Sequence, residues 1–208
     1  MKSNLQRSNN RNDLLLDAAA ELFATQGFRS TTIRDIAKAS GMLPGSVYYH
    51  YASKEELLLA VYDTGVAQIV AAFEAAVSRT NHPWERLSIA ISTHVEAITQ
   101  DSHYMRVINR VLPEHIPDQL GALTEMRAKY EACFQRLIED LPVNASVNRS
   151  LLRLMVLGAL NHTQFWFDPK GELTPAEVGE AFTGFLVESI ATDQTAEKTS
   201  EKGDSHAS

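Results

Sequence analysis

The sequence predicts an all-α protein in which an N-terminal three-helix helix-turn-helix domain precedes a larger helical domain. Apolar residues recur three and four positions apart along most of the 208 residues, which is the spacing of an amphipathic helix. Proline, glycine and capping residues divide these periodic segments into separate helices. Two short helices near the N-terminus are joined by a glycine-containing turn, as in a helix-turn-helix.

The first two helices are bounded by recognisable caps. We expect the polar residues 1–10 to form a flexible arm ahead of the first helix. Gly27 is placed to end that helix in the left-handed conformation. Thr32 precedes the second helix as its N-cap, with Asp35 at the third helical position in a variant of the capping box, and Gly41 ends that helix.

The third helix lies in the stretch GMLPGSVYYHYASKEELL, residues 41–58, which carries four aromatic rings in succession. Pro44 suits the first helical position, where its missing N–H would be unpaired anyway. At about 100° per residue, Val47 and Tyr51 point inward. The other positions are polar donors or let another backbone approach closely: Gly45, Ser46, Tyr48, Tyr49 and His50.

Charge is distributed unevenly along the chain. The formal net charge of -7 is unfavourable for a general polyanion binder. Residues 1–54 nevertheless hold seven Lys and Arg against four Asp and Glu, a net charge of +3, while the remainder carries -10. This asymmetry indicates that the N-terminal part meets an anion, although a chance distribution of solvated charge would give the same counts.

Clear breaks divide the rest of the chain into helices. We expect a long helix over residues 54–79, another from Pro83 to about residue 100, and a third from about residue 118 until shortly before Pro142. Residues 147–168 form the next helix. The last one opens with an N-cap, a first-position proline and a capping-box acid, which are Thr174, Pro175 and Glu177.

The string TTIRDIAKASGMLPGSVYYHYASKEELL, within residues 11–60, resembles the DNA-binding signature of the tetracycline-repressor (TetR) family. The similar elements are T-x-R-D-I-A, a following Gly, G-S-x-Y-Y-H-Y and S-K-E-E-L. The resemblance implies a DNA-binding domain over residues 11–56 and a helical ligand-binding and dimerisation domain over residues 57–191. Composition predicts a disordered tail over residues 192–208.

The resemblance also implies which residues bind a double-stranded DNA operator. Four match positions that hold phosphates: Thr32, Ser46, Tyr48 and Lys54. Four others match positions that approach base edges or the adjacent backbone: Arg34, Gly45, Tyr49 and His50. Phosphate contacts supply affinity and register, whereas base-edge contacts supply sequence preference. The alternative is a small helical hairpin with surface tyrosines.

The helix over residues 147–168 and the last helix are each apolar on more than one side, so each must be covered on more than one side. The TetR family places its dimer interface on these two helices, as a four-helix bundle across a two-fold axis. The resemblance therefore implies a homodimer with an interface at Leu151, Met155, Gly158, Val178, Phe182, Phe185 and Leu186. The alternative is that both are core helices of a monomer.

A small-molecule effector would bind in the second domain, in a pocket that we expect to be mostly apolar with a few polar groups. Arg106 and Arg110 lie four residues apart on one helix face, where they would bind a carboxylate or phosphate, or pair with neighbouring acids. The string LPGS resembles a subgroup that regulates fatty-acid, sterol or aromatic catabolism. This resemblance implies an acyl- or aryl-coenzyme A effector, and the second candidate is a free fatty or aromatic acid. The candidate lining is Met105, Arg106, Asn109, Arg110, Leu157, Asn161, His162, Phe165 and Trp166.

Catalysis, cofactors and metal ions find little support in the sequence. The seven histidines include no His-x-x-x-His or Glu-x-x-His pair, and we expect no catalytic residue, no cofactor and no metal site. The single cysteine, Cys133, excludes an intrachain disulfide and fits a cytoplasmic location. The longest strongly apolar run without charged residues, Leu154–Phe167, covers 14 residues, fewer than the roughly 20 of a membrane span, so we expect no membrane partner.

These patterns predict a ligand-responsive transcriptional repressor that binds a palindromic operator as a homodimer and is released by its effector. One alternative is a multidrug-efflux regulator that senses apolar drugs. Two others, from different classes, are a helical-bundle enzyme and an architectural DNA-coating protein. A specific palindrome protected in footprinting would separate the regulator from both of these classes.

Overall fold

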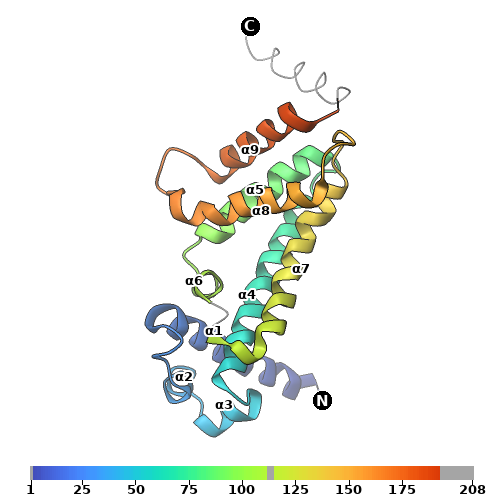
Figure 1. The fold of residues 1–208 in the computed structure, drawn as a ribbon. Helices are drawn as coiled ribbons and strands as arrows, with labels where there is room; N and C mark the ends of the chain where they lie inside the picture. Colours follow the sequence, from blue (N-terminus) through green and yellow to red (C-terminus); the bar gives the residue numbers. More distant parts are fainter. Residues whose placement is uncertain (1, 112–114, 193–208) are drawn as a thin grey trace. The chain divides into compact units, whose positions relative to one another are not determined.

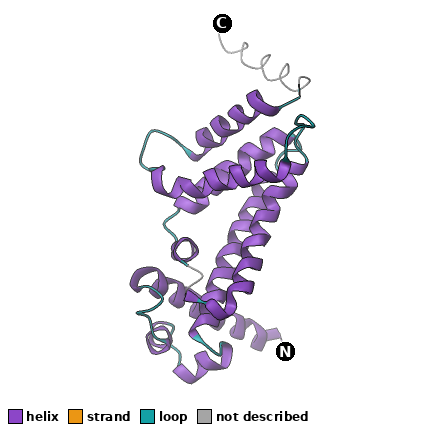
Figure 2. Ribbon diagram, viewed as in Figure 1, coloured by secondary structure: helices purple, strands orange, loops and turns teal. Residues whose placement is uncertain are grey.

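The computed structural model describes residues 2–111 and 115–192, and this part of the chain is helical apart from its connections (Figures 1 and 2). An isolated antiparallel bridge between Val143 and Ala191 is the only strand-like pairing given for the described residues. The all-α prediction is therefore confirmed. In chain order the elements are α1 Lys2–Gln26, α2 Ile33–Ala39, α3 Pro44–His50, α4 Lys54–Val77, α5 Pro83–Thr99, α6 His103–Arg110, the 3-10 helix η2 Pro117–Gln119, α7 Leu120–Glu139, α8 Arg149–Trp166 and α9 Pro175–Ile190.

The predicted helix boundaries are confirmed where short-range caps determine them. Gly27 and Gly41 have φ angles of 85° and 67°, in the left-handed region that glycine adopts at little steric cost. The Asp35 backbone N–H donates to the Thr32 hydroxyl oxygen at 3.2 Å, and the Thr32 backbone N–H donates to the Asp35 carboxylate at 3.0 Å. These bonds satisfy N–H groups that a first helical turn leaves unpaired. The same reciprocal pair precedes α9, formed by Thr174 and Glu177.

Two boundaries differ from their predictions. α1 begins at Lys2, whereas the polarity of residues 1–10 predicts a flexible arm. The segment Lys2–Gln26 contains no glycine or proline, so no local breaker stops the helix from continuing into this polar segment. Residues 103–110 form α6, a separate short helix that the predicted boundaries did not define. Apart from Thr192, the predicted disordered tail lies outside the described residues.

The chain divides into two compact units that do not follow one cut in the sequence. Unit 1 contains residues 1–68 and 100–128, and unit 2 contains residues 69–99 and 129–208. The helices α4 and α7 each contribute residues to both units, because the chain leaves unit 1 along α4 and leaves it again along α7. The linear division into residues 11–56 and 57–191 remains a proposal about function.

Unit 1 holds the three N-terminal helices around buried apolar side chains. Ile36 of α2 and Val47 of α3 are fully buried. The Tyr51 hydroxyl, at the end of α3, donates to Asn12 Oδ1 on α1 at 3.0 Å. α6 packs on α1, where the Tyr104 hydroxyl donates to Asp17 Oδ1 at 2.8 Å. Both the register of α3 and the position of α6 are therefore tied to α1.

In unit 2, α5 packs against α8 and α9 (Figure 1). The core of this unit includes the fully buried side chains of Phe73, Leu87, Ile91, Phe134 and Leu160. α9 approaches α5 so closely at Gly179 that a Cβ atom there would lie 2.6 Å from the Ser88 carbonyl oxygen. A glycine is therefore required at this crossing.

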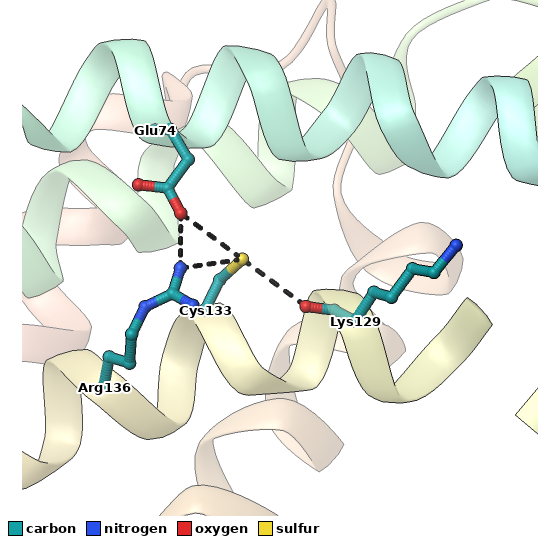
Figure 3. Close-up of polar contacts among 4 residues, drawn as sticks. All are labelled: Glu74, Lys129, Cys133 and Arg136. Carbon is teal, nitrogen blue, oxygen red and sulfur yellow. Dashed lines mark hydrogen bonds and ion pairs between the residues drawn. The ribbon is translucent and has the colours of Figure 1, made fainter. Parts of the chain in front are cut away.

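Unit 2 also contains a polar connection between α4 and α7 beside the single cysteine (Figure 3). Arg136 of α7 forms an ion pair and a hydrogen bond with Glu74 of α4. The Cys133 sulfur lies 3.6 Å from an Arg136 guanidinium nitrogen and 3.6 Å from the Lys129 carbonyl oxygen. Burial raises the pKa of the Cys133 thiol, so this cysteine is a protonated core residue.

One helix in the described residues, α4, is long and apolar enough to cross a membrane by length and composition. Core helices of soluble proteins meet the same two criteria. The apolar side chains of α4 serve the interior, because Leu57, Leu58, Val61 and Tyr62 are buried in unit 1. We therefore assign α4 to the core.

Candidate nucleic-acid interface

The candidate recognition surface lies on α3, a seven-residue helix that starts at Pro44 without a side-chain cap. Val47 is fully buried and anchors the helix, whereas Tyr48 and Tyr49 are 55% and 87% exposed. The Tyr49 and His50 rings meet edge to face, with centroids 5.5 Å apart. An aromatic surface of this size is costly to leave in water, so it is suited to contact with another molecule.

Gly45 allows another molecule to approach the backbone of α3 closely. A Cβ atom at Gly45 would meet no atom within 4 Å, so the backbone there faces open space. With only hydrogen on its α-carbon, the first turn of α3 can approach another backbone closely. Ser46, the next residue, is half-buried. The structure thus brings Gly45, Tyr48, Tyr49 and His50 onto the exposed part of one short helix.

The preceding helix contributes Thr32 and Arg34, which are both exposed. The Thr32 hydroxyl donates to Asp35 Oδ2 at 2.6 Å and receives the Asp35 backbone N–H. Hydrogen bonds from the Thr32 side chain and backbone lower the pKa of Asp35. In this geometry the Thr32 proton is engaged within the cap, so a phosphate contact by Thr32 would require that hydroxyl to turn. Arg34, predicted to approach base edges, is an exposed cation of α2.

Lys54 has internal partners. Its ammonium nitrogen donates to the carbonyl oxygens of Phe28 at 2.8 Å and Thr31 at 3.0 Å. The same nitrogen lies 4.4 Å from the centroid of the Phe28 ring, a cation–π distance. Lys54 therefore holds the turn between α1 and α2. The sequence reasoning did not include Phe28 or Thr31, because contacts across more than twenty residues leave no local pattern.

The predicted effector residues divide between the two units. In unit 1, Met105 is buried and Asn109 is exposed. Arg106 pairs with Asp101 at 2.6 Å, and Arg110 donates to the Ala24 carbonyl oxygen at 3.0 Å. Arg106 thus pairs with a neighbouring acid, which is the alternative to anion binding, whereas the partner of Arg110 is a backbone carbonyl. In unit 2, Leu157 is buried, whereas four others are exposed on α8: Asn161, His162, Phe165 and Trp166.

The predicted dimer residues separate into two sets. Val178 is 3% exposed and belongs to the core of unit 2, so it cannot be part of an exposed interface in this conformation. Phe182 and Leu186 pack against that core from its edge. The exposed members of the predicted set are Leu151, Met155, Gly158 and Phe185. On α8 the first three belong to a longer stripe of exposed residues at helical spacing, which is Leu151, Leu154, Met155, Gly158, His162 and Phe165.

Comparison with known proteins identifies the family. Residues 15–61 match the family described as bacterial regulatory proteins, tetR family. Residues 80–190 match the family described as tetracyclin repressor-like, C-terminal domain. The chain belongs to the TetR family. The first of these matches covers α2 and α3, and the second covers α8 and α9.

Two curated TetR-family relatives resemble the chain over most of its length. It is 28% identical to the HTH-type transcriptional repressor KstR2 of Mycobacterium tuberculosis, over 89% of this chain and 95% of that one. It is also 28% identical to the HTH-type transcriptional activator FasR of Mycolicibacterium smegmatis, over 79% and 75% of the two chains. The solved structure of the ketosteroid transcriptional regulator KstR2 of M. tuberculosis superposes with a TM-score of 0.63 at 27% identity, over 88% and 96%.

The TetR-family match and the exposed α3 surface agree. The protein is a DNA-binding transcription regulator with an N-terminal helix-turn-helix and a helical C-terminal region. The resemblance carried by the string from Thr31 to Leu58 is thereby confirmed at the level of family and fold. The individual DNA, effector and dimer contacts remain predictions.

Proposed function

We propose that this TetR-family protein is a transcriptional repressor that binds a palindromic operator as a homodimer and is released by a small-molecule effector. The single observation that carries the proposal is the exposed aromatic and polar surface of α3 within the family's DNA-binding region. The relatives include a named repressor, KstR2, and a named activator, FasR. The KstR2 match covers more of both chains, and it favours repression.

Side-chain chemistry supports an assignment of each residue to base edges or to phosphates. Tyr49, His50 and Arg34 are all exposed and are assigned to base edges and the adjacent backbone. Tyr48 and Ser46 are assigned to phosphates. Lys54 is assigned to a phosphate as well, and it also supports the surface indirectly, because it donates to two carbonyl oxygens of the α1–α2 turn. Phosphate contacts would set the register of α3 on the DNA, and Tyr49 and His50 would distinguish the base sequence.

A homodimer supplies the two-fold symmetry that a palindrome requires. The apolar stripe on α8 and Phe185 of α9 support this assignment, because large exposed patches of this kind mark interaction surfaces. Gly158 lies within the stripe, and a Cβ there would meet nothing within 4 Å, so it leaves room for a second helix. His162 and Phe165, predicted to line an effector pocket, fit this interface better because they are exposed on the same stripe.

The effector would act by population shift. It would bind preferentially to conformers whose two recognition helices cannot engage both half-sites at once, and the operator-bound population would fall. An acyl- or aryl-coenzyme A, or a related acid, is the proposed effector class. The similar protein KstR2 is a ketosteroid transcriptional regulator, which supports an effector with a large apolar acyl or sterol body. The alternative effector class is apolar drugs. The proposed location of the protein is the cytoplasm.

Footprinting on the DNA upstream of the protein's own gene and its neighbours tests the proposal. We expect a protected palindrome whose half-site centres lie roughly 34–36 Å apart or a multiple of it. Tyr49→Ala should relax the base preference by about 1–3 kcal/mol per lost base contact. Tyr48→Ala, the matched change on the same helix, should weaken binding to all sequences alike. Binding that ignores sequence in the wild type would contradict the proposal.

A further inference from the structure

The interior of unit 2 contains a histidine–tyrosine pair. His94 lies on α5 and is only 5% exposed, and Tyr130 lies on α7. The His94 Nδ1 atom is 2.8 Å from the Tyr130 hydroxyl oxygen, which is a hydrogen-bond distance. The two rings lie at an interplanar angle of 24°. The hydrogen bond and ring contact together orient the imidazole.

The surroundings of this pair are aromatic and apolar. The Phe134 ring meets His94 edge-on with centroids 6.1 Å apart, and Phe73 of α4 contacts both Tyr130 and Phe134. Three helices, α4, α5 and α7, therefore contribute to one four-ring cluster. A polar group in such a place is expensive unless each of its hydrogen-bonding atoms has a partner.

One atom of the pair has no partner. His94 Nε2 is buried and makes no hydrogen bond. A backbone contact from Leu160 opposes the lowering of the His94 pKa, but Nε2 has no partner at hydrogen-bond geometry. Leaving a buried polar atom unpaired costs about 1–3 kcal/mol, and such atoms in native proteins call for an explanation. One explanation is a ligand that supplies the missing hydrogen-bond partner of Nε2.

The electrostatics of the cluster select the kind of partner. Burial lowers the pKa of His94 to about 4 and raises the pKa of Tyr130, so both are neutral at pH 7. The buried polar side chains given for unit 2 are His94, Thr163 and Thr183, and none of them carries a charge at that pH. A carboxylate or ammonium group placed there would be buried without a counter-ion. A carbonyl or hydroxyl would not incur that cost.

We infer that His94, oriented by Tyr130, is the polar anchor in unit 2 that recognises a neutral carbonyl or hydroxyl group on the apolar part of the effector. The inference rests on the proposed function, because it names the chemistry by which the effector is bound. With Tyr130 donating to Nδ1, Nε2–H donates to a carbonyl oxygen. With Nδ1–H donating to Tyr130, Nε2 accepts from a hydroxyl group.

The cluster is closed in this structure, so a ligand must displace packed rings to reach Nε2. Binding then selects conformers in which α4, α5 and α7 have moved apart around His94. Since α4 and α7 also contribute residues to unit 1, their displacement is a physical route by which binding in unit 2 would affect the DNA-binding helices. A thioester carbonyl satisfies the anchor, whereas a free carboxylate does not.

Calorimetric titration of the full chain with three probes of equal chain length tests the inference. The probes are decanoyl-coenzyme A, methyl decanoate and sodium decanoate. Both neutral carbonyl compounds should bind, and decanoate should bind at least tenfold more weakly. His94→Leu should weaken the two carbonyl probes about fivefold to tenfold, the value of one lost hydrogen bond.

Two further variants control for folding and shape. Tyr130→Phe keeps the ring but removes the hydroxyl that orients the imidazole, so it should weaken the carbonyl probes by a smaller factor. Tyr62→Phe removes another buried tyrosine hydroxyl, one that receives a hydrogen bond from Arg127 in unit 1, and should leave probe binding unchanged. Native helix content by circular dichroism would show that each variant is folded.

The possible outcomes separate this inference from the proposed function. Equal binding of decanoate and methyl decanoate, unchanged binding in His94→Leu, or no binding of any probe would overturn the anchor. Footprinting of the unliganded protein does not involve His94, so a protected palindrome would still support the regulator. Loss of carbonyl binding in His94→Leu, with Tyr62→Phe unaffected, would support the anchor even if the protein bound no palindrome.

Discussion

The ammonium group of Lys54 shows how one residue can support a binding surface through contacts within the protein. It donates to two backbone carbonyls of the α1–α2 turn and lies over the Phe28 ring. Those carbonyls follow α1, where backbone acceptors lack helical partners. A cation at this position stabilises the turn that leads into the recognition region. Lys54 is consequently a structural residue of the reader as well as a candidate phosphate contact.

Replacing Lys54 with methionine tests this assignment, because Lys54→Met keeps an apolar stem and removes the ammonium group. We expect the free energy of unfolding to fall by about 1–3 kcal/mol, since two carbonyls lose their donor. Lys38→Met, at an exposed lysine of α2, should change it by less than about 0.5 kcal/mol. Urea denaturation of both variants measures the difference. Wild-type stability combined with uniformly weaker DNA binding would show that Lys54 serves phosphates alone.

His94 makes a second prediction at this scale. Its pKa is about 4 in the folded chain, below the usual value of 6.5, because burial disfavours the charged ring. The unfolded chain therefore binds a proton first as the pH falls. The stabilising contribution is complete above about pH 6.5 and is lost as the pH falls from there towards 4.

Between pH 7 and pH 5 this residue should account for roughly 2 kcal/mol of lost stability. His94→Leu should remove that part of the pH dependence, while His82→Gln, at an exposed histidine before α5, should keep it. Urea unfolding at several pH values provides the measurement. Parallel pH profiles for the wild type and His94→Leu would mean that His94 is not buried in a neutral form.

At the scale of elements, the crossing of α5 and α9 depends on one glycine. A Cβ atom at Gly179 would lie 2.1 Å from Ser92 Oγ and 2.6 Å from the Ser88 carbonyl oxygen. The first of these atoms can rotate away, but the second is backbone and cannot. A larger residue must push α9 away from α5 and thin the core contacts of Val178 and Thr183, which lie on the same buried side.

Gly179→Ala should therefore destabilise the protein by about 1–3 kcal/mol, the usual cost of overpacking. Gly184→Ala is the matched control on the same helix, because a Cβ there meets nothing within 4 Å. It should be neutral or stabilise by up to about 1 kcal/mol through the higher helix propensity of alanine. Thermal unfolding of the pair separates steric contact from propensity. Similar effects from both changes would place Gly179 away from α5.

At the scale of the whole molecule, the proposed self-association depends on the exposed apolar side chains of α8 and α9. Phe185 is 64% exposed, whereas Phe182, three residues earlier, packs against the core of unit 2. A charge at position 182 would damage the core as well as any interface. Phe185 is therefore the residue that reports on self-association without changing the fold.

Phe185→Asp should convert the dimer to a monomer, because the carboxylate would be buried at the interface without a partner. Leu120→Asp, at an exposed leucine of α7 outside the stripe, should leave the molar mass unchanged. Light scattering gives the mass, and operator affinity should fall only for the first variant, since a monomer reads half a palindrome. A dimer that persists in Phe185→Asp would move the interface to another surface.

The sequence alone was sufficient for the fold class, the family and most helix ends, because these depend on neighbouring residues. Thr32 and Asp35 are three positions apart, and Gly27 ends α1 through its own backbone conformation. A capping box or a left-handed glycine forms whatever the distant chain does. The string around α3 identified the DNA-binding region for the same reason, since the helix, its anchor Val47 and its exposed rings are contiguous.

Tertiary structure decided which apolar side of each helix meets its own core and which polar groups meet across the chain. Helical periodicity shows that α9 has more than one apolar side, but only packing on α5 buries Val178 and leaves Phe185 exposed. Lys54 reaches a turn more than twenty residues away, and His94 pairs with Tyr130 across thirty-six. Such pairings depend on how helices cross in space, and side-chain identity in sequence carries no record of that crossing.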